Sequence, residues 1–350
     1  MTTRRWFYLI PASGDPRGLV HAIEPHNLDD LPGQKTIYAG RDGLERGLAA
    51  LVRGCPRVAM EYSPNCAIPY LSRVDAGTIE MVRACGVTVV SSGDLVQRFA
   101  ASWSDEQLAS HRAAAAALYR IKDRAFAAAE QALTRGASLS EYALQQQMVR
   151  WFEEEGLVSD SAPVVAVGPH AGDPHYLPGP TGSAAIARDA VLLLDLWGKA
   201  ATPGAVYADI TWVGITGRVP SRVTDAFDAI VRARDAAVAL VTTAASEGRD
   251  LRGWEVDRAA RQVIDDAGFG AQVLHRTGHS LGESVHGNGA NLDDYETHDD
   301  RRLLPGAGFT IEPGVYFEDF GVRTEINMYR GGAGAEVTGA RQMHLIELGR

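Results

Sequence analysis

The sequence predicts an α+β protein built from two unequal domains, and two patterns along the chain support this. Over the first hundred residues, short apolar runs alternate with stretches of helical spacing, which is typical of a small α/β layer with a mostly parallel sheet. Beyond residue 105, two helices followed by strands occur twice in succession. A repeated element order predicts two halves related by an internal pseudo-two-fold axis. We therefore expect an N-terminal α/β domain at 1–105 and a larger domain at 106–350.

The N-terminal domain is expected to contain four strands and two helices. Apolar and β-branched runs favour the strands, whereas apolar residues three or four positions apart favour the helices. The strands are expected at 6–10, 35–39, 57–62 and 87–90, and the helices at 43–52 and 76–85.

The larger domain is expected to begin with a long, alanine-rich helix at 105–133. A second helix is expected to start at Ser138, because Ser138 and Glu141 fit a capping box, and to end near Gly156. Gly331–Gly334 is expected to form a loop or a hairpin turn. The second pair of helices is expected at 222–247 and 254–267, with Gly268 as a C-terminal stop, and strands are expected at 164–167, 190–197, 206–213, 272–275, 309–312, 323–329 and 344–348.

Charge and composition exclude several classes of protein. The net charge is −10, from 34 basic and 44 acidic residues, which disfavours binding to nucleic acid or to an anionic membrane surface. No apolar run approaches the roughly 18 residues that a membrane helix needs, and the first residues lack the features of a signal peptide. The three cysteines have no metal-like spacing, so we expect reduced thiols and a cytoplasmic location.

Acidic residues stand inside runs that otherwise read as buried strands. Asp195 interrupts the run Val191–Trp197, and burying an unpaired carboxylate costs several kcal/mol or more. A carboxylate at a strand end, capping a loop or bonded to an arginine, is the simpler alternative for a single aspartate. Asp209 follows fourteen residues later in a second apolar run, and Gly198–Gly204 between them contains glycine and proline. This pattern predicts a hairpin with the two aspartates on neighbouring strands.

Glu312 and Glu325 repeat this pattern near the C-terminus, and His279 lies in a polar segment before them. Four such acids cannot each find an arginine, and their mutual repulsion would be strong without cations. Two divalent cations would balance four carboxylates, and one neutral imidazole would complete the set without adding charge. Oxygen ligands with one imidazole suit Mn, Co, Zn or Fe, and a pair of such ions can hold a bridging hydroxide for hydrolysis. The residues thus favour a dinuclear hydrolase site.

These five residues, in the phrases LLLDLW, YADITWVG, HRTGHSLGESVH, TIEPGVY and VRTEIN, resemble the five-ligand signature of the pita-bread metallopeptidases. That family includes prolidase, Xaa-Pro aminopeptidase and methionine aminopeptidase, and the resemblance covers about residues 105–350. It implies a pita-bread catalytic domain that binds two divalent ions, with Mn first and Co, Zn or Fe as alternatives. It further implies that Asp209 chelates one ion, that Asp195 and Glu325 bridge both, and that His279 and Glu312 bind the other. The gap of fourteen residues between the aspartates is a few more than expected and suggests a longer hairpin tip.

The resemblance also implies roles for other polar residues. His175 would line the substrate pocket and contact the scissile peptide, although a plain loop histidine is the alternative. His286 would stabilise the tetrahedral intermediate, and His275 would line the pocket for the proline ring. Arg323 would support the site or bind a substrate end, and neutralising excess carboxylate charge is a compatible structural role. The implied mechanism is attack by a bridging hydroxide, with Glu312 carrying the proton to the leaving amine.

Within the family, the N-terminal α/β domain indicates the branch of creatinase, prolidase and Xaa-Pro aminopeptidase. The resemblance then implies a homodimer that hydrolyses the Xaa-Pro bond of short proline-containing peptides, with a dipeptidase preferred over an aminopeptidase acting on longer peptides. A non-catalytic pita-bread binding protein is the alternative from another class, but such relatives typically lose ligands. Gly278–Gly282 fits the letters of a serine-hydrolase elbow around Ser280, although His279 is then claimed by the metal site. A metal-free, creatinase-like site is disfavoured because all five ligands are present.

Overall fold

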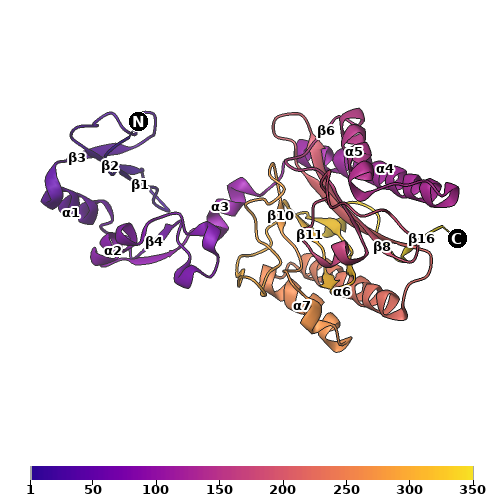
Figure 1. Cartoon of the computed structure of the whole chain (residues 1–350). Helices are drawn as coiled ribbons and strands as arrows, with labels where there is room; N and C mark the ends of the chain where they lie inside the picture. Colours follow the sequence, from indigo (N-terminus) through magenta and orange to yellow (C-terminus); the bar gives the residue numbers. More distant parts are fainter. Residues whose placement is uncertain (1, 350) are drawn as a thin grey trace. The chain divides into compact units, whose positions relative to one another are not determined.

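The computed structural model describes residues 2–349, and the described chain divides into two compact units, up to Gly93 and from Asp94 onward (Figure 1). The sequence placed the domain boundary near residue 105, where the long helix α4 begins. The division falls earlier because the segment just before α4 packs within the second unit. There Gln97 Nε2 donates to the carbonyl of Arg302, and Trp103 Nε1 donates to the carbonyl of Leu281. These residues follow or belong to helix α3 (Gly93–Ala100), which the sequence analysis did not predict.

The first unit contains two small sheets and two α-helices, so the single sheet expected there is divided in two and the strand Arg17–His21 was not predicted, although most of the strand pairing is parallel as expected. Strand β2 pairs antiparallel with β1 and parallel with β3, whereas β4 and β5 form a separate parallel pair. Leu19, Leu48, Ile79 and Val82 belong to its core and are almost completely buried. The strands are β1 (Phe7–Leu9), β2 (Arg17–His21), β3 (Gln34–Tyr38), β4 (Arg57–Met60) and β5 (Thr88–Ser91), and the helices are α1 (Gly40–Leu51) and α2 (Ala76–Ala84).

The second unit begins with two helices that cover one face of a sheet. Buried alanines of α4, such as Ala117 and Ala125, pack in one core with Leu192, Leu194 and Leu196 of β8, and small side chains allow this close approach. The sheet has the order β16-β9-β8-β6, and β7 also pairs with β8. The elements are α4 (Asp105–Arg135), α5 (Glu141–Glu154), β6 (Leu157–Val158), β7 (Val164–Val167), β8 (Val191–Ala200), β9 (Ala208–Thr216) and β16 (Ile346–Leu348).

Helix α5 begins at Glu141, three residues after the expected start. Ser140 is the cap, because its hydroxyl accepts from the backbone N–H of Ala143 at 3.1 Å. Ser138 does not cap the helix, since the backbone around Ser140 is used in an antiparallel bridge to Ala185. The prediction of the start at Ser138 is therefore wrong.

The second half repeats the order of two helices followed by strands, as predicted. Helices α6 and α7 lie on the other side of the β8–β9 strands from α4 and α5 (Figure 1). One sheet has the order β10-β11-β14-β15, and β12 pairs with β13. The elements are α6 (Ser221–Ser246), α7 (Gly253–Asp266), β10 (Ser280–Leu281), β11 (Ala307–Ile311), β12 (Gly314–Tyr316), β13 (Gly321–Arg323), β14 (Ile326–Arg330) and β15 (Ala335–Val337).

Two predicted features of this half are confirmed and two are wrong. Gly268 has φ +83° directly after the helix end, and residues 331–334 connect the antiparallel strands β14 and β15. The expected strand at 272–275 is absent from the described residues: 270–272 form a short 3-10 helix (η4), and the Val273 carbonyl accepts instead from the hydroxyl of Tyr295. The expected single strand at 323–329 is split into β13 and β14 by Thr324 and Glu325.

The two halves of this unit meet where β9 lies against the start of β14. The backbone N–H of Asp209 donates to Asn327 Oδ1 at 3.0 Å, and Asn327 Nδ2 donates back to the Asp209 carbonyl. Thr211 lies two residues after Asp209, and Glu325 lies two residues before Asn327. The N–H of Glu325 donates to the Thr211 carbonyl at 3.1 Å. These bonds place an acid of the second half beside the acids of the first. No helix in the described part of the chain is long and apolar enough to cross a membrane.

Candidate metal centre and active-site pocket

The β8–β9 hairpin presents its acidic side chains on one face. Asp195 pairs with Thr211, and Trp197 pairs with Asp209, in an antiparallel register. Side chains alternate between the faces of a strand, so residues directly opposite one another share a face. Leu192, Leu194 and Leu196 point toward α4 and α5, which leaves Asp195 on the opposite face. The predicted hairpin with aspartates on neighbouring strands is therefore confirmed.

The other acidic and imidazole residues come from the ends of strands in the second half. Glu312 follows β11 directly, and its N–H donates to the Thr277 carbonyl at 2.7 Å. Glu325 lies in the break between β13 and β14, and its carboxylate Oε2 accepts from the Thr211 hydroxyl at 2.7 Å. The backbone of His279 makes two hydrogen bonds to Thr310. Its N–H donates to the Thr310 hydroxyl at 2.9 Å, and its carbonyl accepts from the Thr310 N–H at 2.9 Å. Strand ends from both halves thus converge on one point.

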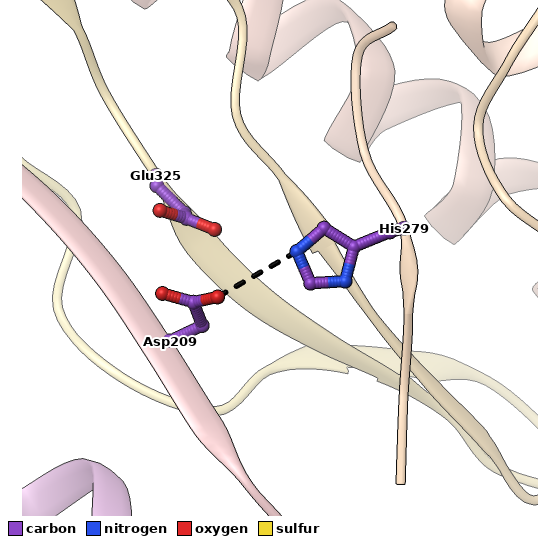
Figure 2. A group of neighbouring side chains, drawn as sticks. All are labelled: Asp209, His279 and Glu325. Carbon is purple, nitrogen blue, oxygen red and sulfur yellow. Dashed lines mark ion pairs between the residues drawn. The ribbon is translucent and has the colours of Figure 1, made fainter. Parts of the chain in front are cut away.

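Asp209, His279 and Glu325 form a compact, buried cluster with ligand atoms within 4.8 Å of one another (Figure 2). His279 Nε2 lies 3.5 Å from Asp209 Oδ2 and 3.4 Å from Glu312 Oε1. Asp209 Oδ1 and Glu325 Oε1 are buried and have no hydrogen-bond partner among residues 2–349. Buried carboxylate oxygens without donors are costly unless a cation compensates them. The donor set therefore fits a divalent metal ion.

Asp195 lies beside this cluster and is engaged by Arg323. The buried guanidinium of Arg323 donates to Asp195 Oδ2, to the Thr211 hydroxyl at 3.0 Å and to the Tyr316 hydroxyl at 3.0 Å. The Tyr316 hydroxyl is in turn 2.7 Å from His275 Nε2. Pairing of Asp195 with an arginine was the simpler alternative for that aspartate, and the structure contains this pair. Arg323 also neutralises carboxylate charge, as its structural role requires.

Burial shapes the protonation of this centre. Burial raises the pKa of Asp195 to about 7, and burial together with neighbouring carboxylates raises the pKa of Asp209 and of Glu325 well above their usual range. Burial opposes ionisation of Glu312 as well, but the adjacent imidazoles of His279 and His275 bring its pKa below the ordinary value. Such packing of acids is the electrostatic environment that a cation relieves.

All nine predicted site residues line one pocket of about 830 Å³. Its walls also include Asp160, Tyr176, Trp197 and Glu296. The ring of His286 stands edge-on to His279, with 4.4 Å between the ring centroids. The nine predicted residues that line this pocket are Asp195, Asp209, His279, Glu312, Glu325, His175, His275, His286 and Arg323.

Glu141 makes a set of buried contacts that the sequence analysis missed, since it was expected only as a capping-box residue. Its carboxylate is fully buried and accepts from the N–H of Val167 at 2.7 Å, the N–H of Ala184 at 2.7 Å and the hydroxyl of Tyr176 at 2.6 Å. His170 Nδ1 lies 3.0 Å from both carboxylate oxygens. One carboxylate therefore anchors both ends of the loop that carries His175. The sequence offered only an acid in the first turn of a helix, which is common for other reasons.

Fold and site together define a metallopeptidase of the pita-bread class. Residues 111–330 match the profile of metallopeptidase family M24, and the chain belongs to that family. Over 328 residues the chain is 27% identical to a probable dipeptidase PepE of Mycobacterium tuberculosis, an alignment that covers 91% of this chain and 78% of the relative. It is 28% identical over 211 residues to a Xaa-Pro dipeptidase of Pyrococcus furiosus, covering 59% of this chain and 54% of the relative.

The fold is shared with solved structures of this family. The crystal structure of dipeptidase PepE from Mycobacterium ulcerans superposes with a TM-score of 0.64 at 24% identity, covering 97% of this chain and 86% of the other. The expected resemblance and the expected fold are both confirmed. Ser280 is no hydrolytic nucleophile: it is 1% exposed, and its hydroxyl accepts from the N–H of Gly289 at 2.9 Å.

Proposed function

We propose that this metallopeptidase is a Xaa-Pro dipeptidase that works with two divalent metal ions. The observation that carries the proposal is the convergence of four carboxylates and one imidazole in one pocket, where two buried carboxylate oxygens accept from no donor in the described part of the chain. The names of the relatives agree with it, because one is a Xaa-Pro dipeptidase and another is a probable dipeptidase.

The residues that would hold the ions are Asp195, Asp209, His279, Glu312 and Glu325. Oxygen ligands with a single imidazole fit Mn first, and Co, Zn or Fe as alternatives. The resemblance implied that Asp195 bridges the ions and that Asp209 chelates one. Asp209 lies beside both His279 and Glu325, so it would hold an ion together with them, whereas Asp195 would hold an ion while it is also engaged by Arg323.

The protein side chains around the centre have separate tasks in hydrolysis. Two divalent cations, when bound, lower the pKa of water and polarise a carbonyl oxygen. Glu312 is the carboxylate that carries a proton to the leaving nitrogen, since it is buried in the pocket beside His279. Burial lowers the pKa of His286 to about 4, so its imidazole is neutral near pH 7 and donates an N–H to the developing oxyanion.

The remaining pocket residues orient the peptide. His175 projects from the loop that Glu141 anchors, and His275 is held by Arg276 and Tyr316. We assign these two imidazoles to contacts with the scissile bond and the proline ring. All three nitrogen atoms of the Arg323 guanidinium bond to protein oxygens, so we assign Arg323 to support of the site.

The proposal extends to the setting of the enzyme. A proline nitrogen is a tertiary amide that most peptidases leave intact, so the substrate would be a short peptide with proline after the scissile bond. A homodimer and a cytoplasmic location stay predictions from the sequence. Sedimentation analysis of the purified chain tests the dimer.

A peptide panel with metal analysis tests the proposed function. The protein is purified without added metal, its metal content is measured, and Mn²⁺ is added before assays with Xaa-Pro dipeptides and matched Xaa-Pro-Yaa tripeptides. We expect Mn²⁺-dependent hydrolysis of the dipeptides. Cleavage of only the tripeptides would instead show an aminopeptidase, and absence of both metal binding and cleavage would refute a catalytic role.

A further inference from the structure

The charged residues that line the pocket can be sorted by their partners. Six carboxylates and two arginines lie in its walls, and four of the carboxylates belong to the proposed ligand set. Glu296 faces Arg276, with 3.9 Å between its Oε2 and Arg276 Nη1, and Arg323 pairs with Asp195. Asp160 is the remaining acid, and within residues 2–349 it takes part in no ion pair with a basic side chain. The pocket thus contains one carboxylate with neither a cation nor a proposed ligand role.

The position of Asp160 is fixed by a neighbouring pocket residue. It lies in the loop between β6 and β7, and its Oδ1 accepts from Trp197 Nε1 at 2.7 Å. Trp197 stands directly opposite Asp209 in the β8–β9 register and two residues after Asp195, on the same face of the sheet. The indole therefore holds the Asp160 carboxylate at the side of the pocket nearest the β8 and β9 acids, while Oδ2 accepts no hydrogen bond from the described residues and Asp160 is exposed.

A peptide substrate carries a cation of the kind that would pair with this carboxylate. The α-ammonium of a peptide is joined through one carbon to the carbonyl carbon of its first peptide bond. A peptidase that removes or releases the first residue must therefore accommodate that ammonium in the pocket where the bond is broken. An internal residue of a protein chain has no such charge unless its side chain is basic. A charge-assisted hydrogen bond to a carboxylate is the usual means of selecting a cationic nitrogen.

We infer that Asp160 binds a cationic nitrogen of the first residue of the substrate, either its α-ammonium group or the side chain of a first Lys or Arg. This rests on the proposed function, since it places the scissile Xaa-Pro bond in this pocket. Asp160 is a substrate-binding residue and not a metal ligand. The Trp197 indole lies beside the bound nitrogen and presents an apolar surface to the rest of the first residue.

Three compounds separate the two sources of the charge. Leu-Pro carries the α-ammonium alone, Lys-Pro adds a side-chain cation, and 4-methylpentanoyl-proline is Leu-Pro without its amino group. The variant Asp160→Asn keeps the acceptor for Trp197 and removes only the negative charge. Asp225→Asn on α6 is the matched control, because Asp225 is exposed, lies outside the pocket and makes the same change in net charge.

The Mn²⁺-loaded enzyme is assayed first. If the α-ammonium is the ligand, D160N raises KM for Leu-Pro roughly 10- to 100-fold with a nearly unchanged kcat, and it abolishes the preference for Leu-Pro over the des-amino analogue. If the side chain is the ligand, D160N abolishes a preference for Lys-Pro over Leu-Pro. The control D225N leaves every ratio unchanged. The inference is overturned if D160N retains both wild-type preferences, or if it lowers all three activities equally.

Equilibrium binding separates failure of this inference from failure of the proposed function. Calorimetry measures binding of Leu-Pro, Lys-Pro and the des-amino analogue to the protein as purified, without turnover as the readout. If wild type hydrolyses no Xaa-Pro dipeptide but binds the cationic compounds more tightly, and D160N does not, the proposed function fails while the Asp160 site stands. Equal binding of all three compounds by wild type and D160N overturns the inference on its own.

Discussion

Replacing Glu141 with glutamine perturbs the anchor of the pocket loop without touching the proposed ligands. The carboxylate receives four donors, from Val167, His170, Tyr176 and Ala184, and it has no exposed surface. The glutamine amide has only one oxygen. In either orientation its NH₂ group therefore replaces a carboxylate oxygen that accepted from a backbone N–H, of Val167 or of Ala184. That backbone N–H then loses its acceptor, whereas the Tyr176 hydroxyl can turn to accept from the amide; the loss is about 1–3 kcal/mol.

That loss is large beside a total stability of about 5–15 kcal/mol. The melting temperature should fall by roughly 2 °C or more, since 1 kcal/mol corresponds to about 2–4 °C in a domain of this size. Glu153→Gln is the matched control, because Glu153 is an exposed residue of the same helix. Differential scanning calorimetry measures the shift, and hydrogen exchange shows whether the amides of 168–184 become less protected.

The same variant tests whether Glu141 acts through His175. We expect E141Q to lower kcat/KM, and His175→Ala to have a much smaller further effect in the E141Q background than in wild type. Additive effects of the two substitutions would show that Glu141 contributes only to stability. A melting temperature and loop exchange that match E153Q would refute the reasoning about the anchor.

Three further predictions follow from the centre and its surroundings. Chelation of the bound ions should lower the melting temperature, because a ligand that binds only the folded state stabilises it by about 2.7 kcal/mol when its free concentration is a hundred times its dissociation constant. Calorimetry with and without chelator measures this shift, and an unchanged transition would contradict the prediction. Arg323→Lys should lower kcat/KM markedly while the fold persists, since an ammonium cannot reproduce the fork that joins Asp195, Thr211 and Tyr316; steady-state kinetics with a circular-dichroism control decides it. Burial lowers the pKa of His111 from 6.5 to about 4, so the unfolded chain binds more protons and stability is lost as pH falls through this range. Urea unfolding should show about 2 kcal/mol less stability at pH 5 than at pH 7.5 from this residue, and His111→Gln should remove that part of the pH dependence.

The sequence predicted the features of the site that depend on local pattern. Alternating side chains in β8 and β9 were sufficient to place Asp195 and Asp209 on neighbouring strands, because a hairpin is determined by nearby residues. Glu312 and Glu325 were found for the same reason, as acids within apolar runs. Their convergence in one pocket followed from charge balance before any contact was known.

The features that were missed depend on contacts between distant segments. Thr324 and Glu325 split an expected strand because their N–H groups bond to Pro313 and Thr211, which the local pattern cannot indicate. Glu141 gains its role only when the ends of a loop more than twenty residues away close on it. Asp160 is an ordinary surface aspartate in the sequence and becomes distinctive only beside Trp197 in the pocket.

The most direct measurement of the central claim is the metal content of the purified chain together with that of Asp209→Ala. The account predicts about two equivalents of divalent metal per wild-type chain, and loss of bound metal and of peptidase activity in the variant, since Asp209 clusters with His279 and Glu325. A wild-type chain that binds less than one equivalent, or a D209A variant that retains both its metal and its activity, would contradict the account.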